Sequence, residues 1–219
     1  MIRVAIPSLH FGQQLRQIIM EHGFMTFPQF IDNRYIIETK ASVKWLEKQL
    51  KKYGNGLVEF AVAPDLMYDD MRRLKREWSH INWIFPLHSR NEDFSDFEWV
   101  GFPHAQFRRD YDLETFLELT EGKKRWYLGF WDESNPRVLY FFDGMDTVLP
   151  ETYSGKYGKI WLGWNKTEDV SDLNMPTIEI FEFNVISLKI ALRKLFAEQH
   201  SFTVLDVFLK EKTLEVNQK

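Results

Sequence analysis

The chain has 219 residues, with 28 Lys and Arg against 32 Asp and Glu, a formal net charge of −4, and a high 16% of aromatic residues. This length and composition fit one large α/β or β domain and exclude intrinsic disorder. The absence of cysteine excludes disulfides, thiolate nucleophiles and every cysteine-ligated metal site. The slight acidic excess argues against non-specific coating of nucleic acid, although it permits a local basic groove.

The hydropathy pattern predicts no membrane segment. No run of about 18 apolar residues is free of charge, and the start, Met1-Ile2-Arg3-Val4, lacks the pattern of a signal peptide. We therefore expect a soluble, cytoplasmic protein without a membrane role.

Short strand-like runs that end at Pro, Gly, Asp or His alternate with amphipathic segments, which is typical of βα units. The clearest unit is a strand over 57–63, stopped by Pro64-Asp65, a helix over 66–78 and a second strand over 81–85. The predicted strands are residues 3–6, 24–30, 57–63, 81–85, 97–101, 125–130, 138–142 and 159–164. The predicted helices are residues 11–21, 66–78, 113–121 and 184–198.

This count predicts a closed α/β barrel of the (β/α)8, TIM-like type, compact and with shortened helices. An open, doubly wound sheet is the alternative. The chain has no repeat or linker that would mark a boundary, so we expect one domain over 1–219, with 200–219 as a C-terminal extension.

Polar side chains follow most of the predicted strands, where the carboxyl ends of barrel strands form one face. They are Asp32, Asp65, His88, His104, Asp143 and Asp146. Several carboxylates that meet in one cleft are an acid/base pattern. Alternatively, each Asp caps the helix that follows it by accepting a backbone N–H bond.

One stretch carries a more specific pattern. It comprises Lys124-Arg125-Trp126-Tyr127-Leu128-Gly129, then Asp143-x-x-Asp146-x-Val148-x-Pro150, then Ser154-Gly155-Lys156-Tyr157-Gly158. In order and spacing this resembles the tRNA-guanine transglycosylase family. Weaker similarities are Ala63-Pro64-Asp65, Val100-Gly101-Phe102 and the helix over 184–198, so that the resemblance extends over most of the chain.

The resemblance implies roles for two catalytic residues. Asp146 is similar to the nucleophilic aspartate, which attacks the anomeric carbon of a guanosine and holds the sugar covalently while bases exchange. Asp32, in Asp32-Asn33-Arg34-Tyr35, is similar to the general acid/base of a motif that has two glycines where this chain has Arg34 and Tyr35.

The resemblance also implies a set of substrate-binding residues. They are Asp65, which would accept the N–H groups of the purine, His88 in place of a base-reading glutamine, Gly101 and Leu128 lining the base pocket, Tyr35 as a stacking ring, and Asp143 as an orienting or capping side chain. For His88 a surface or capped histidine is the alternative.

The family's Cys3His zinc site is absent and the chain is short. In this respect it is similar to DNA-directed 7-deazaguanine transglycosylase relatives of phages and bacterial islands. The resemblance therefore implies base exchange in a polynucleotide, with DNA slightly favoured over tRNA, a 7-deazaguanine such as preQ0 as the incoming base, and no cofactor or metal. Because they border the predicted cleft, Arg108, Arg109 and Lys156 are the expected nucleic-acid contacts.

Two other functions stay open, since fold alone does not decide function. One is a catalytically inactive barrel that binds nucleic acid, which the missing glycines after Asp32 favour. The other is a barrel enzyme that acts on a small nucleoside or sugar, which the acidic net charge favours.

Overall fold

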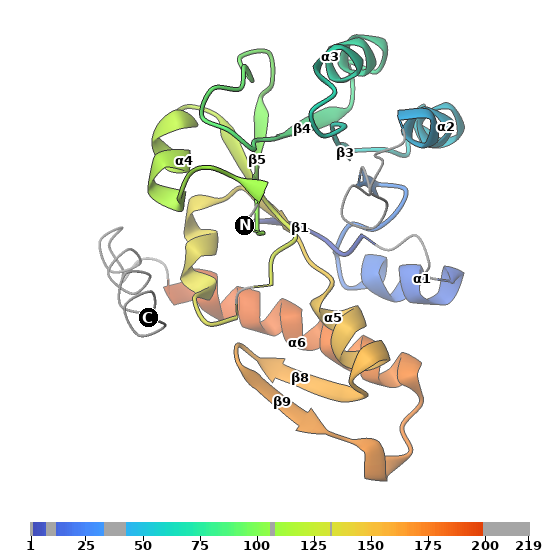
Figure 1. Ribbon diagram of the computed structural model, residues 1–219. Coiled ribbons are helices and arrows are strands. Elements are labelled where there is room, and N and C mark those ends of the chain that lie inside the picture. Colours follow the sequence, from blue (N-terminus) through green and yellow to red (C-terminus); the bar gives the residue numbers. More distant parts are fainter. Residues whose placement is uncertain (1, 8–11, 33–42, 106–107, 132, 199–219) are drawn as a thin grey trace.

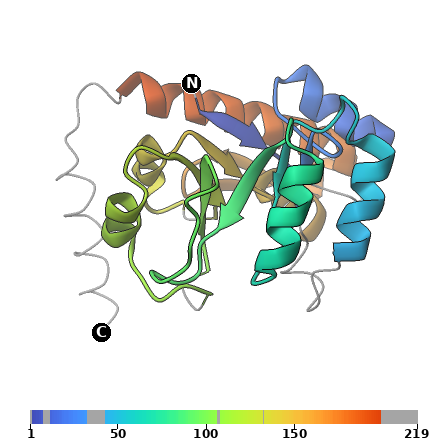
Figure 2. The same ribbon diagram turned by 90° about the horizontal axis from the view of Figure 1, so that it is seen from above.

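The computed structural model describes residues 2–7, 12–32, 43–105, 108–131 and 133–198. Seven parallel strands of this part form one curved sheet, with helices around its outer side (Figures 1 and 2). The strands are β1 (Arg3–Ala5), β2 (Phe30–Ile31), β3 (Phe60–Val62), β4 (Asn82–Pro86), β5 (Trp99–Pro103), β6 (Lys124–Leu128) and β7 (Gly144–Asp146).

The sheet is a nearly closed barrel. Its strands pair in the order β1-β7-β6-β5-β4-β3-β2, so the first strand is bonded to the last. Between β1 and β2 the opening is narrowed by a parallel bridge between Ala5 and Met25, where Ile6 N donates to Met25 O at 2.8 Å. The fold is thus an α/β barrel of the TIM type, as predicted, and the open doubly wound sheet is excluded because that sheet would not join β1 to β7.

Aromatic side chains fill the barrel interior. Trp126 is fully buried, stacks on Phe30 with ring centroids 5.1 Å apart, and lies 5.0 Å from Phe60 and 5.9 Å from Trp99. Gly144 makes room for it, since a Cβ there would lie 2.3 Å from the Trp126 ring. Each buried ring of this kind contributes about 1.5–3 kcal/mol. The interior is therefore a packed core, and a site must lie at an end of the barrel.

Amphipathic helices cover the outside of the barrel. The longer ones are α1 (Gln13–Glu21), α2 (Val43–Tyr53), α3 (Tyr68–Glu77), α4 (Leu113–Leu119) and α6 (Thr177–Glu198). In α3, Met71 and Leu74 are buried at helical spacing, and α4 begins at Asp112, whose carboxylate accepts a bond from Thr115 N at 2.9 Å. None of the described helices has the length and apolar character needed to cross a membrane.

Two of the eight predicted strands are wrong, and a third, over 24–30, overlaps β2 only at Phe30 because residues 27–29 form a turn. Residues 138–142 lie in and directly after a 3₁₀ helix, η2 (Pro136–Phe141), in which Pro occupies the first turn; the seventh barrel strand is β7 instead. The predicted strand over 159–164 corresponds to β8 (Lys159–Gly163), which pairs antiparallel with β9 (Lys166–Asp169) outside the barrel. The described residues therefore supply seven barrel strands, not eight.

The β8–β9 hairpin is attached to the barrel through α6, which lies between the two (Figure 1). Asn184 of α6 is fully buried and acts like one residue of a neighbouring strand: its Oδ1 accepts from Trp161 N at 2.6 Å and its Nδ2 donates to Lys159 O at 3.0 Å. The helix begins at Thr177, seven residues before the predicted start at 184, and the predicted extension over 200–219 lies outside the described residues.

Candidate functional site

A small pocket of about 120 Å³ lies at the carboxyl ends of the barrel strands. It is lined by Asp32, Asp65, Pro86, His88, Pro103, His104, Ala105, Arg108, Leu128, Gly129 and Asp146. The structure thus brings together the two predicted catalytic carboxylates, Asp32 and Asp146, and Asp65, the residue predicted to bind the purine, each from a different strand end.

Asp146 ends β7 and is held from two sides. Its Oδ1 accepts the indole N–H of Trp126 at 2.9 Å, and its Oδ2 accepts Gly129 N at 3.0 Å. Its side chain is buried, with 8% of the residue exposed. Burial, followed by the nearby charge of Asp32, raises the pKa of Asp146 from its ordinary 3.8 to about 7, although both hydrogen bonds act in the opposite direction.

The loop after β6 fixes the Gly129 donor in place. Gly129 has a φ of +68°, a conformation that costs other residues about 1–2 kcal/mol. The next residue, Phe130, donates its N–H to Asp146 O at 2.7 Å and accepts the Thr147 hydroxyl at 2.8 Å. The ends of β6 and β7 are therefore hydrogen-bonded beyond their last sheet pair. This holds the Asp146 carboxylate in a fixed orientation before any substrate binds.

Asp65 follows β3 and faces two cationic side chains. It is buried, with 7% exposed; His88 Nε2 lies 3.3 Å from its Oδ1, and an Arg108 guanidinium nitrogen lies 4.0 Å from its Oδ2. His88 is positioned by Glu92, whose Oε2 accepts the His88 backbone N–H at 2.6 Å. A buried carboxylate with two such neighbours is compensated electrostatically.

The geometry assigns the protons of His88. Its Nδ1 lies 2.7 Å from the carbonyl oxygen of Arg108, which can only accept, so Nδ1 carries a hydrogen. A neutral His88 would then direct the lone pair of Nε2 at Asp65, whereas a charged one directs an N–H. Burial lowers the pKa of His88, but the hydrogen bond and charge of Asp65, together with the Arg108 carbonyl and the charge of Glu92, raise it above 6.5 overall.

Two predicted substrate-binding residues lie away from the pocket. Gly101 is buried in β5, and a Cβ there would lie 2.5 Å from Cδ1 of Leu128; the glycine makes room for Leu128, which does line the pocket. Asp143 is exposed and precedes β7, whereas Asp146 ends it, and its carboxylate accepts Arg125 N at 2.9 Å. Asp143 therefore lies at the opposite end of the barrel. Tyr35 is outside the described residues.

The three predicted nucleic-acid contacts also separate. Arg108 lines the pocket. Arg109 is directed inward, where it donates to Pro103 O at 3.1 Å and stacks over the Phe102 ring at 4.1 Å. Lys156 is exposed at the end of the π-helix η3 (Thr152–Lys156) and does not line the pocket.

The sequence gives little signal for two residues that hold the site. Trp126 donates to Asp146 from inside the barrel, and a tryptophan in a strand is ordinarily taken as core. Gly129 follows directly after β6, which marks a turn but not a donor to a carboxylate. Among the described residues no group of three His, Asp or Glu side chains is arranged to hold a metal ion.

No family model matches the chain. It is 27% identical over 136 residues to "Uncharacterized protein ORF192" of Acidianus two-tailed virus, an alignment that covers 58% of this chain and 69% of that protein. The structure is similar, with a TM-score of 0.46 and 13% identity over 86% of this chain and 99% of the other, to N-(5′-phosphoribosyl)anthranilate isomerase from Pyrococcus furiosus. That likeness is too distant to bear on the chemistry of the pocket.

Proposed function

We propose that the chain exchanges guanine for a 7-deazaguanine base, such as preQ0, within a polynucleotide, through a glycosyl ester on Asp146. One observation carries the proposal: Asp32, Asp65 and Asp146 come from three strand ends and line one pocket. Helix capping does not require such convergence. Substitution at a glycosidic bond does, because it needs a nucleophile, a proton donor and a group that holds the leaving base.

The reaction has two balanced steps. In the first, an oxygen of ionised Asp146 attacks C1′ of the target nucleoside, the C1′–N9 bond breaks, and the guanine leaves with that electron pair and a proton from Asp32. In the second, Asp32 takes the N9 proton of the incoming base, N9 attacks C1′, and the ester bond to Asp146 breaks. Both carboxyl groups return to their starting states.

The surroundings of Asp146 support the nucleophilic role. Its pKa near 7 makes the carboxylate more basic, and so more nucleophilic, than an exposed one, and the Trp126 and Gly129 donors fix its orientation. The first step needs Asp146 ionised while Asp32 holds a proton, so the two carboxyl groups must share one proton, and the rate should fall above about pH 7, where that proton is lost.

Asp65 with His88 and Arg108 supports base binding. A carboxylate accepts the N–H groups of a guanine edge, and the neighbouring imidazole and guanidinium supply donors for its carbonyl oxygen. To reach C1′, the target nucleotide must leave its base stack, so a single strand or a flipped nucleotide is the expected substrate. Without a cysteine-ligated zinc site, DNA remains slightly favoured over tRNA.

A free nucleoside is a second candidate substrate. Two of the three predicted phosphate contacts, Arg109 and Lys156, do not line the pocket, and its volume of about 120 Å³ suits a base better than a nucleotide chain. On this alternative the same carboxylates act on a nucleoside or sugar in solution.

The test is release of guanine, measured by mass spectrometry after incubation with single-stranded DNA, tRNA and free guanosine, and in parallel the incorporation of labelled guanine. Release and incorporation with a polynucleotide support base exchange. Release from guanosine alone assigns the second candidate, and release from none of the three contradicts both. Asp143→Asn, which changes a carboxylate at the other end of β7, is the matched control for Asp146→Asn.

A further inference from the structure

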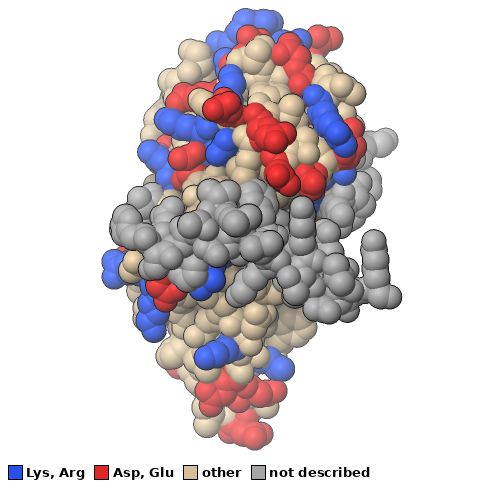
Figure 3. Space-filling view, turned by 90° about the vertical axis from the view of Figure 1, so that its left-hand side faces the viewer, with Lys and Arg blue, Asp and Glu red and all other residues tan. Residues whose placement is uncertain are grey.

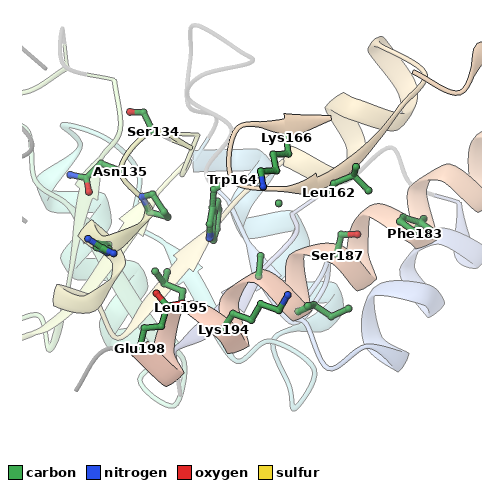
Figure 4. Close-up of a pocket in the computed structure, with 15 residues that line it drawn as sticks. Ser134, Asn135, Leu162, Trp164, Lys166, Phe183, Ser187, Lys194, Leu195 and Glu198 are labelled. Atoms are coloured by element: carbon green, nitrogen blue, oxygen red, sulfur yellow. The ribbon is translucent and has the colours of Figure 1, made fainter. Parts of the chain in front are cut away.

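A second, larger cavity lies outside the barrel, between α6, the β8–β9 hairpin and residues 134–137 (Figure 4). Its volume is about 500 Å³, and we call it the hairpin groove. Three large apolar side chains line it while remaining well exposed: Leu162 at 49%, Phe183 at 43% and Ile190 at 47%. Such a concentration of exposed apolar surface is typical of a binding site.

Cationic side chains lie beside these three apolar side chains in the groove. Lys166 of the hairpin and Lys194 of α6 both extend into the space between the two elements (Figure 4), and Arg137 also lines the groove. Across the described residues neither lysine forms an ion pair, and Glu198 is the one carboxylate in the lining. The groove is therefore locally cationic on a chain whose net charge is −4.

The side of the molecule shown in Figure 3 is not uniformly cationic. On the side shown in Figure 3, Lys and Arg mix with Asp and Glu over the upper part, and acidic side chains gather at the lower tip, the end that the hairpin forms in Figure 1. The groove's own lysines attract an anionic partner over the Debye length of about 8–10 Å.

The groove is linked to the barrel pocket by one short loop. Gly129 lines the pocket, Asn135 lines the groove, and the carboxylate of Glu133 between them is buried. Glu133 accepts the Trp161 indole N–H and, at 3.2 Å, Asn165 N, so it fastens the loop to the hairpin. Six residues span at most about 20 Å, which corresponds to about six stacked nucleotides.

We infer that the hairpin groove binds a single-stranded polynucleotide, a few nucleotides away from the one whose base enters the barrel pocket. Bases would stack on Phe183 and the neighbouring apolar side chains, and the backbone phosphates would lie against Lys166 and Lys194. The inference deepens the proposed function and rests on it for the identity of the strand as substrate. It replaces Arg109 and Lys156 with a different set of phosphate contacts.

The binding test uses a fluorescein-labelled, single-stranded DNA of about 12 nucleotides, long enough to span both sites, and fluorescence anisotropy over a range of salt concentrations. The double variant Lys166→Glu, Lys194→Glu should bind at least about tenfold more weakly, and the slope of log K against log salt should shrink by about 1.4, the value for two phosphate contacts. Phe183→Ser should weaken binding with an unchanged slope. The matched control, Lys48→Glu with Lys51→Glu on α2, makes the same change in charge at exposed lysines away from the groove.

Equal loss of binding in the groove variant and the α2 control would overturn the inference, as would a wild-type protein that binds acidic polyglutamate but no DNA. The proposed function is tested separately, by guanine exchange in a DNA of about three nucleotides, which is too short to reach the groove. Groove-dependent DNA binding without exchange would leave the groove assigned and refute the exchange. Exchange whose dependence on DNA length is the same in the groove variant and the wild type would refute the groove alone.

Discussion

Replacing Asp146 by Asn should make the protein more stable at neutral and alkaline pH, although it removes the nucleophile. The carboxyl group has a pKa of about 7 in the folded protein, mainly because it is buried, against 3.8 when it is free in water. Between these values the unfolded chain releases the proton and the folded chain keeps it, so the free energy of unfolding falls as the pH rises.

The size of this effect follows from the two pKa values. About three powers of ten in proton affinity, at about 1.4 kcal/mol each, cost the wild type about 4 kcal/mol above pH 7, of which about 2–3 kcal/mol appears between pH 5 and pH 8. Asparagine is never charged and avoids this cost. It leaves either the Trp126 or the Gly129 donor facing an NH2 group, a loss of about 1–3 kcal/mol that does not depend on pH.

The assay is urea unfolding of wild type and Asp146→Asn at pH 5 and pH 8, followed by tryptophan fluorescence. The stability of the variant relative to the wild type should improve by about 2–3 kcal/mol between the two pH values. Asp143→Asn, at an exposed position of the same chain segment, is the control for the loss of a carboxylate there. A difference between wild type and Asp146→Asn that is the same at pH 5 and pH 8 would refute the buried, proton-retaining carboxyl group.

Three further predictions concern the walls of the site and the hairpin. In Gly101→Ala the new Cβ, 2.5 Å from Leu128 Cδ1, should push that side chain toward the pocket, raising KM and costing about 1–3 kcal/mol in urea unfolding. His88→Gln should raise KM more than it lowers kcat, because it removes the cation opposite Asp65. The charged His88 stabilises the fold below pH 6.5, and this stabilisation is lost as the pH rises through its raised pKa. The wild type should therefore have a higher free energy of unfolding than the variant at acidic pH and lose that difference at alkaline pH. Asn184→Leu removes the partners of the buried Trp161 N–H and of the part-buried Lys159 carbonyl of β8 and should cost about 2–4 kcal/mol, with faster hydrogen exchange in the hairpin than in the barrel.

Five of the seven barrel strands, β1, β3, β4, β5 and β6, are predictable because their apolar runs are buried in the barrel and end near Pro, Gly or Asp. Residues 138–142 mislead for a physical reason: Val138, Leu139 and Phe142 are buried as a strand would bury them, but Pro136 starts a helical turn. The strand β8 is present over most of the predicted range, and only its partner is unexpected, since the sequence does not reveal that a side chain of α6 occupies its other edge.

The convergence of Asp32, Asp65 and Asp146 follows from topology, because each lies at or shortly after the carboxyl end of a barrel strand. The position of Asp143 at the opposite end of the barrel does not follow in this way. Asp143 comes after the predicted strand over 138–142, but it lies just before the actual three-residue strand β7. The pairing of Trp126 with Asp146 and the inward turn of Arg109 depend on side-chain packing across neighbouring strands. Periodicity in the sequence carries no information on such contacts.

The role of Asp146 as the covalent nucleophile is tested most directly by intact-protein mass spectrometry after incubation with a guanine-containing single-stranded DNA, without an incoming base, and quenching in denaturant. We expect the wild type to gain the mass of the DNA less guanine, through an ester at Asp146, and Asp146→Asn to gain nothing while it still binds the DNA. An adduct of the same mass on Asp146→Asn, or its assignment to another residue such as Asp32 in the wild type, would contradict this role.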